Sequence, residues 1–223
     1  MATQPSVTGA YVGASGFSYP SWRGEFYPPG TKPGEFLRLY AERLPSVELN
    51  NTFYRLPSEQ QFAKWAEQTP TSFRFAVKMS RRITHFGGLQ MIGTFCERVR
   101  ALGDRLGPVL VQLPPTRPRD DGFLRLMLES LDPELEYAFE FRHPSWNDVE
   151  VPVRVNSLGG AAPLRYLRIR EPPYDEAALQ VWAERLRPLL ADGIAVYVYF
   201  KHEDAPSAPS YAERLLELLA HAG

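Results

Sequence analysis

The sequence contains a single cysteine, Cys96, among its 223 residues. One cysteine cannot form an intramolecular disulfide, and it cannot supply a cysteine cluster for a structural metal. Histidine is also scarce, with four residues in the whole chain, whereas a catalytic metal needs clustered histidines and carboxylates. No glycine-rich dinucleotide fingerprint follows the first predicted strand. We therefore expect neither a bound metal nor another cofactor.

The chain also lacks a strong net charge and long hydrophobic runs. Its formal net charge is -1, so no global basic field attracts nucleic acid, although a local basic patch is compatible with this value. No apolar run reaches the length of a membrane span, and residues 1–8 lack the basic and apolar regions of a signal peptide. We expect a cytoplasmic protein that does not interact with membranes.

What is present is the composition of an ordinary globular protein, with 44% hydrophobic and 23% charged residues. Segments with strand periodicity alternate with segments of helical spacing almost throughout, which favours a parallel α/β fold. The predicted strands are 10–16, 46–50, 73–79, 108–113, 137–143, 164–170 and 194–201. This pattern predicts one domain over residues 1–223, folded as a TIM-type (β/α)8 barrel.

One strand–helix unit of such a barrel is irregular. Residues 147–163 contain Pro152, Gly159, Gly160 and Pro163, which do not allow a sustained helix. We predict a short, degenerate strand at residues 151–155 with no helix covering it. The missing helix would expose apolar surface near Phe139 and Phe141, so we expect either a homodimer or a folded loop to cover it.

The stretch from Tyr137 to Trp146 is unusual because it places charges in a predicted core strand. Phe139 and Phe141 alternate with Glu140 and Arg142, and both faces of the strand are expected to be buried. A buried carboxylate or guanidinium is costly unless it is paired and hydrogen-bonded. This pattern predicts an ion pair at the mouth of the barrel.

Other predicted strands carry polar residues near their carboxyl ends as well. In a barrel these ends converge on one rim, where active sites of such folds lie. The residues are Glu48, Asn50, Lys78, Gln112, Glu140, Arg142, Arg168, Arg170 and Lys201. They form either a functional site or a salt-bridged core that only fixes the strand register, and the number of buried charges favours a site.

Five ordered motifs resemble those of one known family. They are Gly13–Tyr19, Glu48–Tyr54, Phe75–Lys78, Val111–Pro115 and Glu140–Trp146. Together they are similar to the DUF72 (YecE-like) family, over nearly the whole chain. The resemblance implies a TIM-type barrel related in shape to xylose isomerase-like and endonuclease IV-like enzymes. It implies no established activity, and DNA binding is suggested only by that shape.

The sequence departs from this family at two places. The segment 147–163 is too short for the full helix and the further strand that the family usually has there. Where many members have Arg-x-His-Gly, this chain has Arg168-Ile169-Arg170-Glu171. A permanent cation thus replaces an imidazole, which argues against a proton shuttle at Arg170.

The residue types at the rim favour an anion site over other chemistries. Glu48 and Glu140 are candidate catalytic carboxylates, but neighbouring cations would keep both ionised and make either a poor general acid. Lys78, Arg142, Arg168 and Lys201 could bind phosphate or carboxylate. Further candidate ligand-binding residues are Asn50, Tyr54, Gln112, His143 and Trp146.

Two hypotheses of different class follow. The first is an enzyme acting on a phosphorylated or otherwise anionic small molecule, with Glu48 or Glu140 as the base. The second is a nucleic-acid-binding barrel, catalytic or not. A steep loss of DNA affinity with salt would favour the second hypothesis, and tight binding of a free anionic metabolite would favour the first.

Overall fold

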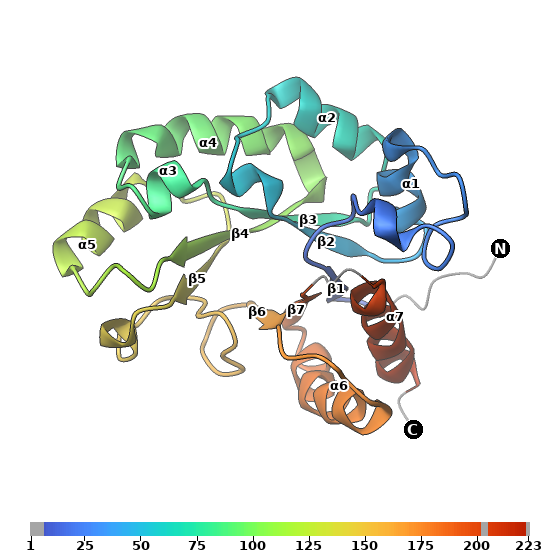
Figure 1. Ribbon diagram of the computed structural model, residues 1–223. Helices are drawn as coiled ribbons and strands as arrows, with labels where there is room; N and C mark the ends of the chain where they lie inside the picture. Colours follow the sequence, from blue (N-terminus) through green and yellow to red (C-terminus); the bar gives the residue numbers. More distant parts are fainter. Residues whose placement is uncertain (1–6, 202–204, 222–223) are drawn as a thin grey trace.

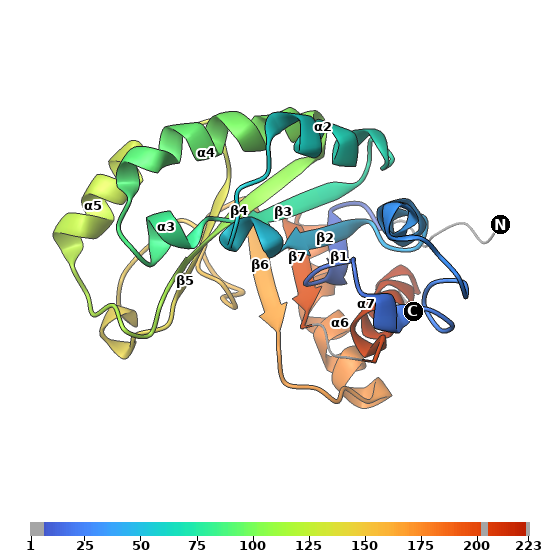
Figure 2. The ribbon, with the colours of Figure 1, turned by 45° about the horizontal axis from the view of Figure 1, so that its top comes forward.

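A computed structural model of the protein describes residues 7–201 and 205–221. Seven parallel strands form one sheet that curves into a nearly closed barrel (Figures 1 and 2), in the order β5-β4-β3-β2-β1-β7-β6. Their bounds are β1 Ala10–Ala14, β2 Ser46–Leu49, β3 Arg74–Lys78, β4 Leu106–Leu113, β5 Tyr137–Phe141, β6 Leu164–Ile169 and β7 Ala195–Phe200. The predicted α/β class and TIM-type barrel are confirmed.

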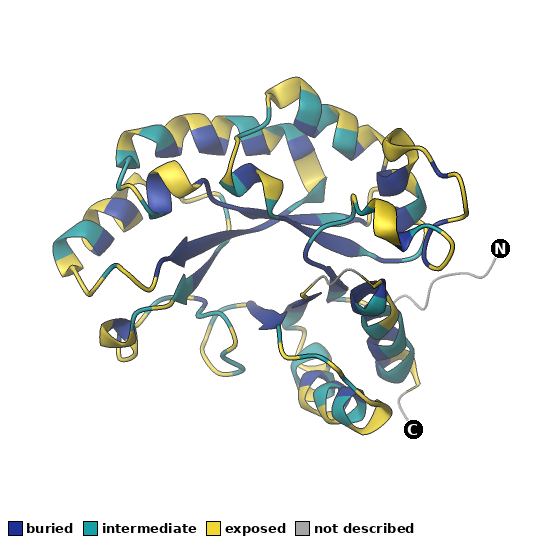
Figure 3. Cartoon of the chain, in the orientation of Figure 1, coloured by how far each residue is buried: buried dark blue, intermediate teal, exposed yellow. Residues whose placement is uncertain are grey.

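Helices surround the sheet and bury their apolar faces against it (Figure 3). Side-chain caps fix several helix starts; Ser58, for example, accepts a hydrogen bond from the Gln61 N–H at 3.2 Å at the start of α2. No helix in the two described ranges is long and apolar enough to cross a membrane. The helices are α1 Phe36–Ala41, α2 Glu59–Glu67, α3 Arg81–Thr84, α4 Ile92–Val99, α5 Asp121–Ser130, α6 Glu176–Ala191 and α7 Ser207–Ala220.

The interior of the barrel is filled unevenly. Small or aliphatic side chains line it on one side, among them Ala76 and Ala138, whereas β6 and β7 contribute the rings of Tyr166, Tyr197 and Tyr199. The alternation along each strand places these residues on the same face as the polar residues at the strand ends. The tyrosine rings fill the part of the interior towards the amino ends of the strands, and the charged groups lie towards the carboxyl ends.

β5 and β6 are the two edges of the sheet, and residues 153–156 connect them. The Phe139 N–H donates to the Val153 carbonyl at 2.8 Å, and the Val155 N–H donates to the Phe139 carbonyl at 2.9 Å. On the other side, the Asn156 N–H donates to the Tyr166 carbonyl at 2.9 Å. The predicted short strand is thus reduced to a single parallel bridge, Phe139–Arg154, and residues 147–163 contain no helix.

A folded loop covers the place of the missing helix. Trp146 stacks on Phe141 with ring centroids 5.0 Å apart, and the Arg154 guanidinium lies 5.2 Å above the Phe141 ring. Arg154 also donates to the carbonyls of Trp146 and Val149, both at 2.7 Å. Phe139 is only 1% exposed, so no dimer is required to cover this side.

Arginine–carbonyl bonds replace regular backbone pairing in the rest of this segment. The buried Arg165 side chain donates to the carbonyls of Leu158, Gly160 and Ala162 at 2.6–2.8 Å. These hydrogen bonds give the three carbonyl groups the partners that no helix or strand supplies here. The segment is therefore ordered without regular secondary structure.

The expectation that Arg142 is buried in the strand is wrong. β5 ends at Phe141, and Arg142 is exposed rather than buried. The reason is that the reduced strand leaves β5 as an edge strand beyond Phe139, so solvent reaches its carboxyl end.

Candidate functional site

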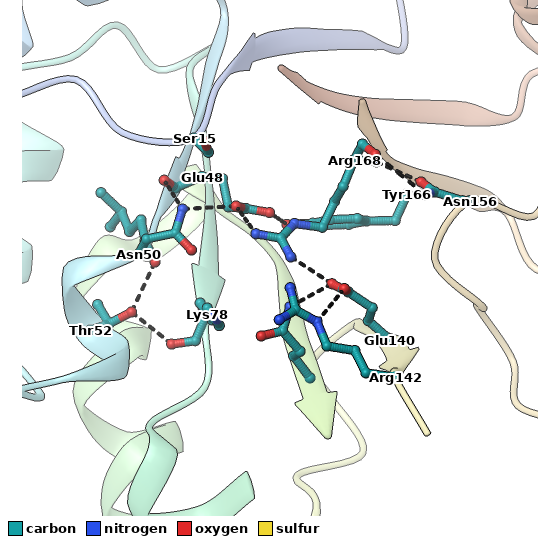
Figure 4. Close-up of polar contacts among 12 residues, drawn as sticks. Ser15, Glu48, Asn50, Thr52, Lys78, Glu140, Arg142, Asn156, Tyr166 and Arg168 are labelled. Carbon is teal, nitrogen blue, oxygen red and sulfur yellow. Dashed lines mark hydrogen bonds and ion pairs between the residues drawn. The ribbon is translucent and has the colours of Figure 1, made fainter. Parts of the chain in front are cut away.

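The buried Arg168 side chain is the centre of a charged cluster inside the barrel (Figure 4). Its Nη2 lies 2.8 Å from Glu48 Oε1, and its Nη1 lies 2.5 Å from Glu140 Oε2. Arg168 comes from β6, whereas the two carboxylates come from β2 and β5. One guanidinium therefore connects three strands across the barrel.

Glu48 is completely buried and fully hydrogen-bonded. Besides Arg168, it accepts from Asn50 Nδ2 at 2.8 Å and from the Tyr166 hydroxyl at 2.8 Å. Burial alone would raise the pKa of Glu48, but Arg168 and these donors outweigh it and lower the pKa. Glu48 is thus an ionised carboxylate whose oxygens are already occupied.

Glu140 is held in a similar way nearer to solvent. Gln112 Nε2 donates to its Oε2 at 2.7 Å, and Arg142 Nε donates to its Oε1 at 3.0 Å. Burial raises the pKa of Glu140, but Arg168, Gln112 and Arg142 together lower it to about 2. Neither carboxylate carries a proton at neutral pH, and both are weak bases.

The free energy of unfolding is expected to depend on the ionisation of Glu140 at acid pH. Because the pKa of folded Glu140 is about 2 and its ordinary value is 4.5, its carboxylate stabilises the fold fully only above about pH 5. That contribution, on the order of 3 kcal/mol, is lost as the pH falls through 4.5 towards 2. Urea unfolding at a series of pH values should show a shallower acid dependence for Glu140→Gln than for the wild type.

Glu129→Gln, at an exposed position on α5, is the matched control and should keep the wild-type acid dependence. An unchanged slope in Glu140→Gln would contradict the assignment of a strongly stabilised carboxylate at this position.

Cations outnumber carboxylates in this part of the barrel. Lys78 is 8% exposed, and its Nζ lies 4.0 Å from the Phe53 ring centroid. Burial and then Arg168 lower the pKa of Lys78 to about 8. The pKa of the half-buried Arg170 is also lowered, by burial and then by Arg168. No ion pair among the described residues includes Lys78 or Arg170.

The loop after β2 contacts both Glu48 and Lys78. Asn50 contacts Glu48, and Phe53 contacts the Lys78 ammonium. Thr52 Oγ1 lies 2.7 Å from the Lys78 carbonyl oxygen and 2.9 Å from the Leu49 carbonyl oxygen. A short 3₁₀ turn at Asn51–Phe53 thereby fixes the end of β3 relative to β2.

Of the residues predicted from the sequence, the structure brings seven into or beside this cluster. They are Glu48, Asn50, Lys78, Gln112, Glu140, Arg142 and Arg168.

The remaining four lie elsewhere. Trp146 is fully buried against Phe141 and donates to the Arg117 carbonyl, so it forms no open wall. His143 Nδ1 accepts from the Ser145 N–H at 3.2 Å. Tyr54 and Lys201 are exposed.

Tyr166 and Asn156 belong to the site but were not predicted. Tyr166 lies within the predicted strand 164–170, and the signal that could have identified it is that a buried tyrosine hydroxyl needs a hydrogen-bond partner. Asn156 has a φ of 65°, and its Oδ1 accepts from the Arg168 N–H at 2.7 Å. Asparagine tolerates this backbone conformation better than most residues. An asparagine inside an irregular segment was therefore the signal that could have identified Asn156.

Two cavities lie beside the cluster rather than over it. One, of about 220 Å³, is lined by residues 16–19 and 49–51 and so includes Asn50. The other, of about 230 Å³, is lined in part by Tyr54, Arg55, Arg82 and Arg98. The cluster reaches solvent through Glu140 and Arg142, whose side chains are 17% and 35% exposed.

The sequence and the fold are similar to those of known proteins. A family model described as "Protein of unknown function DUF72" matches residues 11–158. The chain is 34% identical over 142 residues to UPF0759 protein YecE of Escherichia coli K12, covering 61% of this chain and 49% of that protein. It is 28% identical over 149 residues to UPF0759 protein YunF of Bacillus subtilis, covering 61% and 51%. The chain thus spans about half the length of the curated relatives it matches.

Solved structures agree over a longer range. The fold matches a crystal structure of a DUF72 family protein from Thermotoga maritima with a TM-score of 0.77 and 26% identity, covering 94% of this chain and 98% of that one. A DUF72 family protein from Enterococcus faecalis gives a TM-score of 0.75 at 19% identity, covering 96% of each chain, which supports the fold alone. The family-model match ends before β6, the strand that carries Arg168.

Proposed function

The chain belongs to the DUF72 family of proteins of unknown function, and we propose that the charged rim of its barrel binds a small anionic molecule. The observation that carries this proposal is the excess of cations. Among residues 7–201 and 205–221, only two carboxylates, Glu48 and Glu140, lie near the cations Lys78, Arg142, Arg168 and Arg170. A bound anion would neutralise the positive charge of these cations that the described carboxylates leave unbalanced.

Within the cluster, Arg142 is the residue best suited to contact an anion from solvent. It uses Nε on Glu140, and its two terminal nitrogens make no hydrogen bond to another described residue. Its side chain is 35% exposed. A guanidinium with two free N–H groups can bind phosphate or carboxylate through two parallel hydrogen bonds.

In this proposal Arg168 positions the site rather than contacting the ligand. It is 4% exposed, and both terminal nitrogens are bonded to carboxylates. Glu48 and Glu140 likewise hold cations in place, and their lowered pKa values argue against a role for either as a general base.

A separate surface feature favours nucleic acid as a second candidate ligand. Tyr54 and Phe86 are 67% and 71% exposed, and the Arg81 guanidinium lies 5.5 Å and 5.9 Å from their ring centroids. Exposed aromatic rings beside arginines are typical of surfaces on which bases stack. A steep fall in the affinity for single-stranded DNA with rising salt would support this candidate.

Sulfate or phosphate is expected to raise the melting temperature of the protein. A ligand that binds only the folded state stabilises it by about 2.7 kcal/mol when its concentration is a hundred times Kd. Thermal melts should be recorded against sulfate, with sodium chloride at matched ionic strength as the comparison. A chelator should leave the melting curve unchanged.

Arg142→Gln should reduce the stabilisation by sulfate, because it removes the most exposed cation of the cluster. Arg38→Gln, in an exposed ion pair on α1, is the control and should respond as the wild type does. Equal stabilisation by sulfate and chloride, or an undiminished response in Arg142→Gln, would refute the anion site.

A further inference from the structure

Lys78 is a buried amine without a carboxylate partner in the part of the chain that the structure describes. Buried lysines are normally paired, because an isolated ammonium is costly to remove from water. Here the side chain is 8% exposed, and its described contact is with the face of Phe53, 4.0 Å from Nζ to the ring centroid. Such a group is retained at a cost to stability, which points to a chemical use.

The charges around Lys78 come from several elements of the barrel. They are Arg168 on β6, Glu140 and Arg142 at the end of β5, Glu48 on β2, and His85 after α3. Burial and Arg168 dominate, and they lower the pKa of Lys78 to about 8. The pKa of His85 is lowered too, by burial and then by Lys78, so its imidazole is neutral. About a tenth of Lys78 is therefore a free amine at pH 7.

A desolvated lysine beside another cation is a nucleophile for carbonyl groups. Lys78 lies at the carboxyl end of β3, the end at which barrel enzymes carry their reactive groups. Arg142 and Arg170 follow the carboxyl ends of β5 and β6 at the same rim of the barrel, and they could hold a carboxylate or phosphate while the amine reacts with a carbonyl of the same molecule.

We propose that Lys78 captures the carbonyl group of an anionic substrate, a 2-oxo acid or a phosphorylated ketone or aldehyde, as a Schiff base. This inference rests on the proposed anion site and names the substrate class for it.

The step needs no oxidant or reductant. The Nζ lone pair forms a bond to the carbonyl carbon, and the C=O π electrons move to the oxygen, which takes a proton. Nζ loses a proton to water, the carbinolamine hydroxyl takes a second proton from the solvent, and this group leaves as water while the nitrogen lone pair forms the C=N bond. The protonated product is a cation at the position of the original ammonium, so the Phe53 ring stabilises it as well.

Reductive trapping tests the proposal on the full chain. The protein is incubated with pyruvate or dihydroxyacetone phosphate and with borohydride, which reduces an iminium to a stable secondary amine, and the adduct is located by peptide mass mapping. The chain has four lysines, Lys32, Lys64, Lys78 and Lys201. We expect labelling of Lys78 to exceed that of exposed Lys64 by about tenfold or more, because its neutral fraction is larger.

Matched variants separate the reaction from the fold. Lys78→Arg keeps the charge but has no primary amine, so it should lose the adduct while still unfolding cooperatively in urea; Lys64→Arg should retain both the adduct at Lys78 and the stabilisation by sulfate. The labelling rate at Lys78 should rise with pH, with a midpoint near 8. Labelling spread evenly over the lysines would overturn the proposal.

Two outcomes distinguish this inference from the proposed anion site. If sulfate stabilises the protein but Lys78 resists trapping, the Schiff base fails and the anion site stands. If neutral acetone labels Lys78 as readily as pyruvate does and sulfate does not compete, the amine is reactive but the anionic substrate class is wrong.

Discussion

Arg168→Met is expected to lower the free energy of unfolding by about 3–5 kcal/mol, because it leaves two carboxylates in the barrel without their shared cation. Glu48 is fully buried, and Glu140 has a side chain that is 17% exposed. Urea unfolding at pH 7 measures the change. The same substitution should raise the pKa of both carboxylates, so the variant should regain stability relative to the wild type as the pH falls below 6.

Two further variants sharpen this experiment. Arg142→Gln should cost about 1 kcal/mol or less, since that side chain is 35% exposed and makes one ion pair. The triple variant Glu48→Gln, Glu140→Gln, Arg168→Met removes all three charges and should recover much of the loss. If Arg168→Met and Arg142→Gln destabilise equally, Arg168 is not the central charge of the barrel.

Trp146→Ala is expected to cost about 3–5 kcal/mol, as large-to-small changes at buried aromatic positions do. The side chain is completely buried, stacks on Phe141, and donates from Nε1 to the Arg117 carbonyl at 2.9 Å. Its loss should also loosen the loop that covers the place of the missing helix. Hydrogen exchange should therefore quicken at the backbone amides of residues 146–156.

Phe86→Ala is the control for this prediction, because Phe86 is 71% exposed and its truncation should change stability by less than about 0.5 kcal/mol. Unchanged exchange at the Val155 amide, which bonds to Phe139, would show that Trp146 does not hold the closing segment.

The sequence predicted the strands well because most of them alternate and carry a polar residue near the carboxyl end. It also placed Glu48, Lys78, Glu140 and Arg168 at one rim, because the carboxyl ends of parallel strands meet there. The family resemblance is confirmed by the match over residues 11–158. These results follow from local patterns and from the geometry common to barrels.

The relative importance of Arg142 and Arg168 could not be predicted in the same way. Both are arginines near strand ends, and their difference depends on which strand becomes an edge. Glu48 and Arg168 are 120 residues apart in the sequence, and no local pattern identifies such a pair. The segment 147–163 has no periodicity, so nothing local indicated that Arg154 and Arg165 would satisfy its carbonyls.

The position of Arg168 late in the chain has a consequence for folding during synthesis. Strands β1 to β5 pair with their neighbours in the order in which they leave the ribosome. Their barrel interior, however, contains Glu48 and Glu140 before β6 has been made. Burying these carboxylates without Arg168 is unfavourable, so the five-strand intermediate should stay open until β6 and β7 emerge and β7 pairs with β1. The charged cluster thus makes completion of the barrel the last step of its assembly.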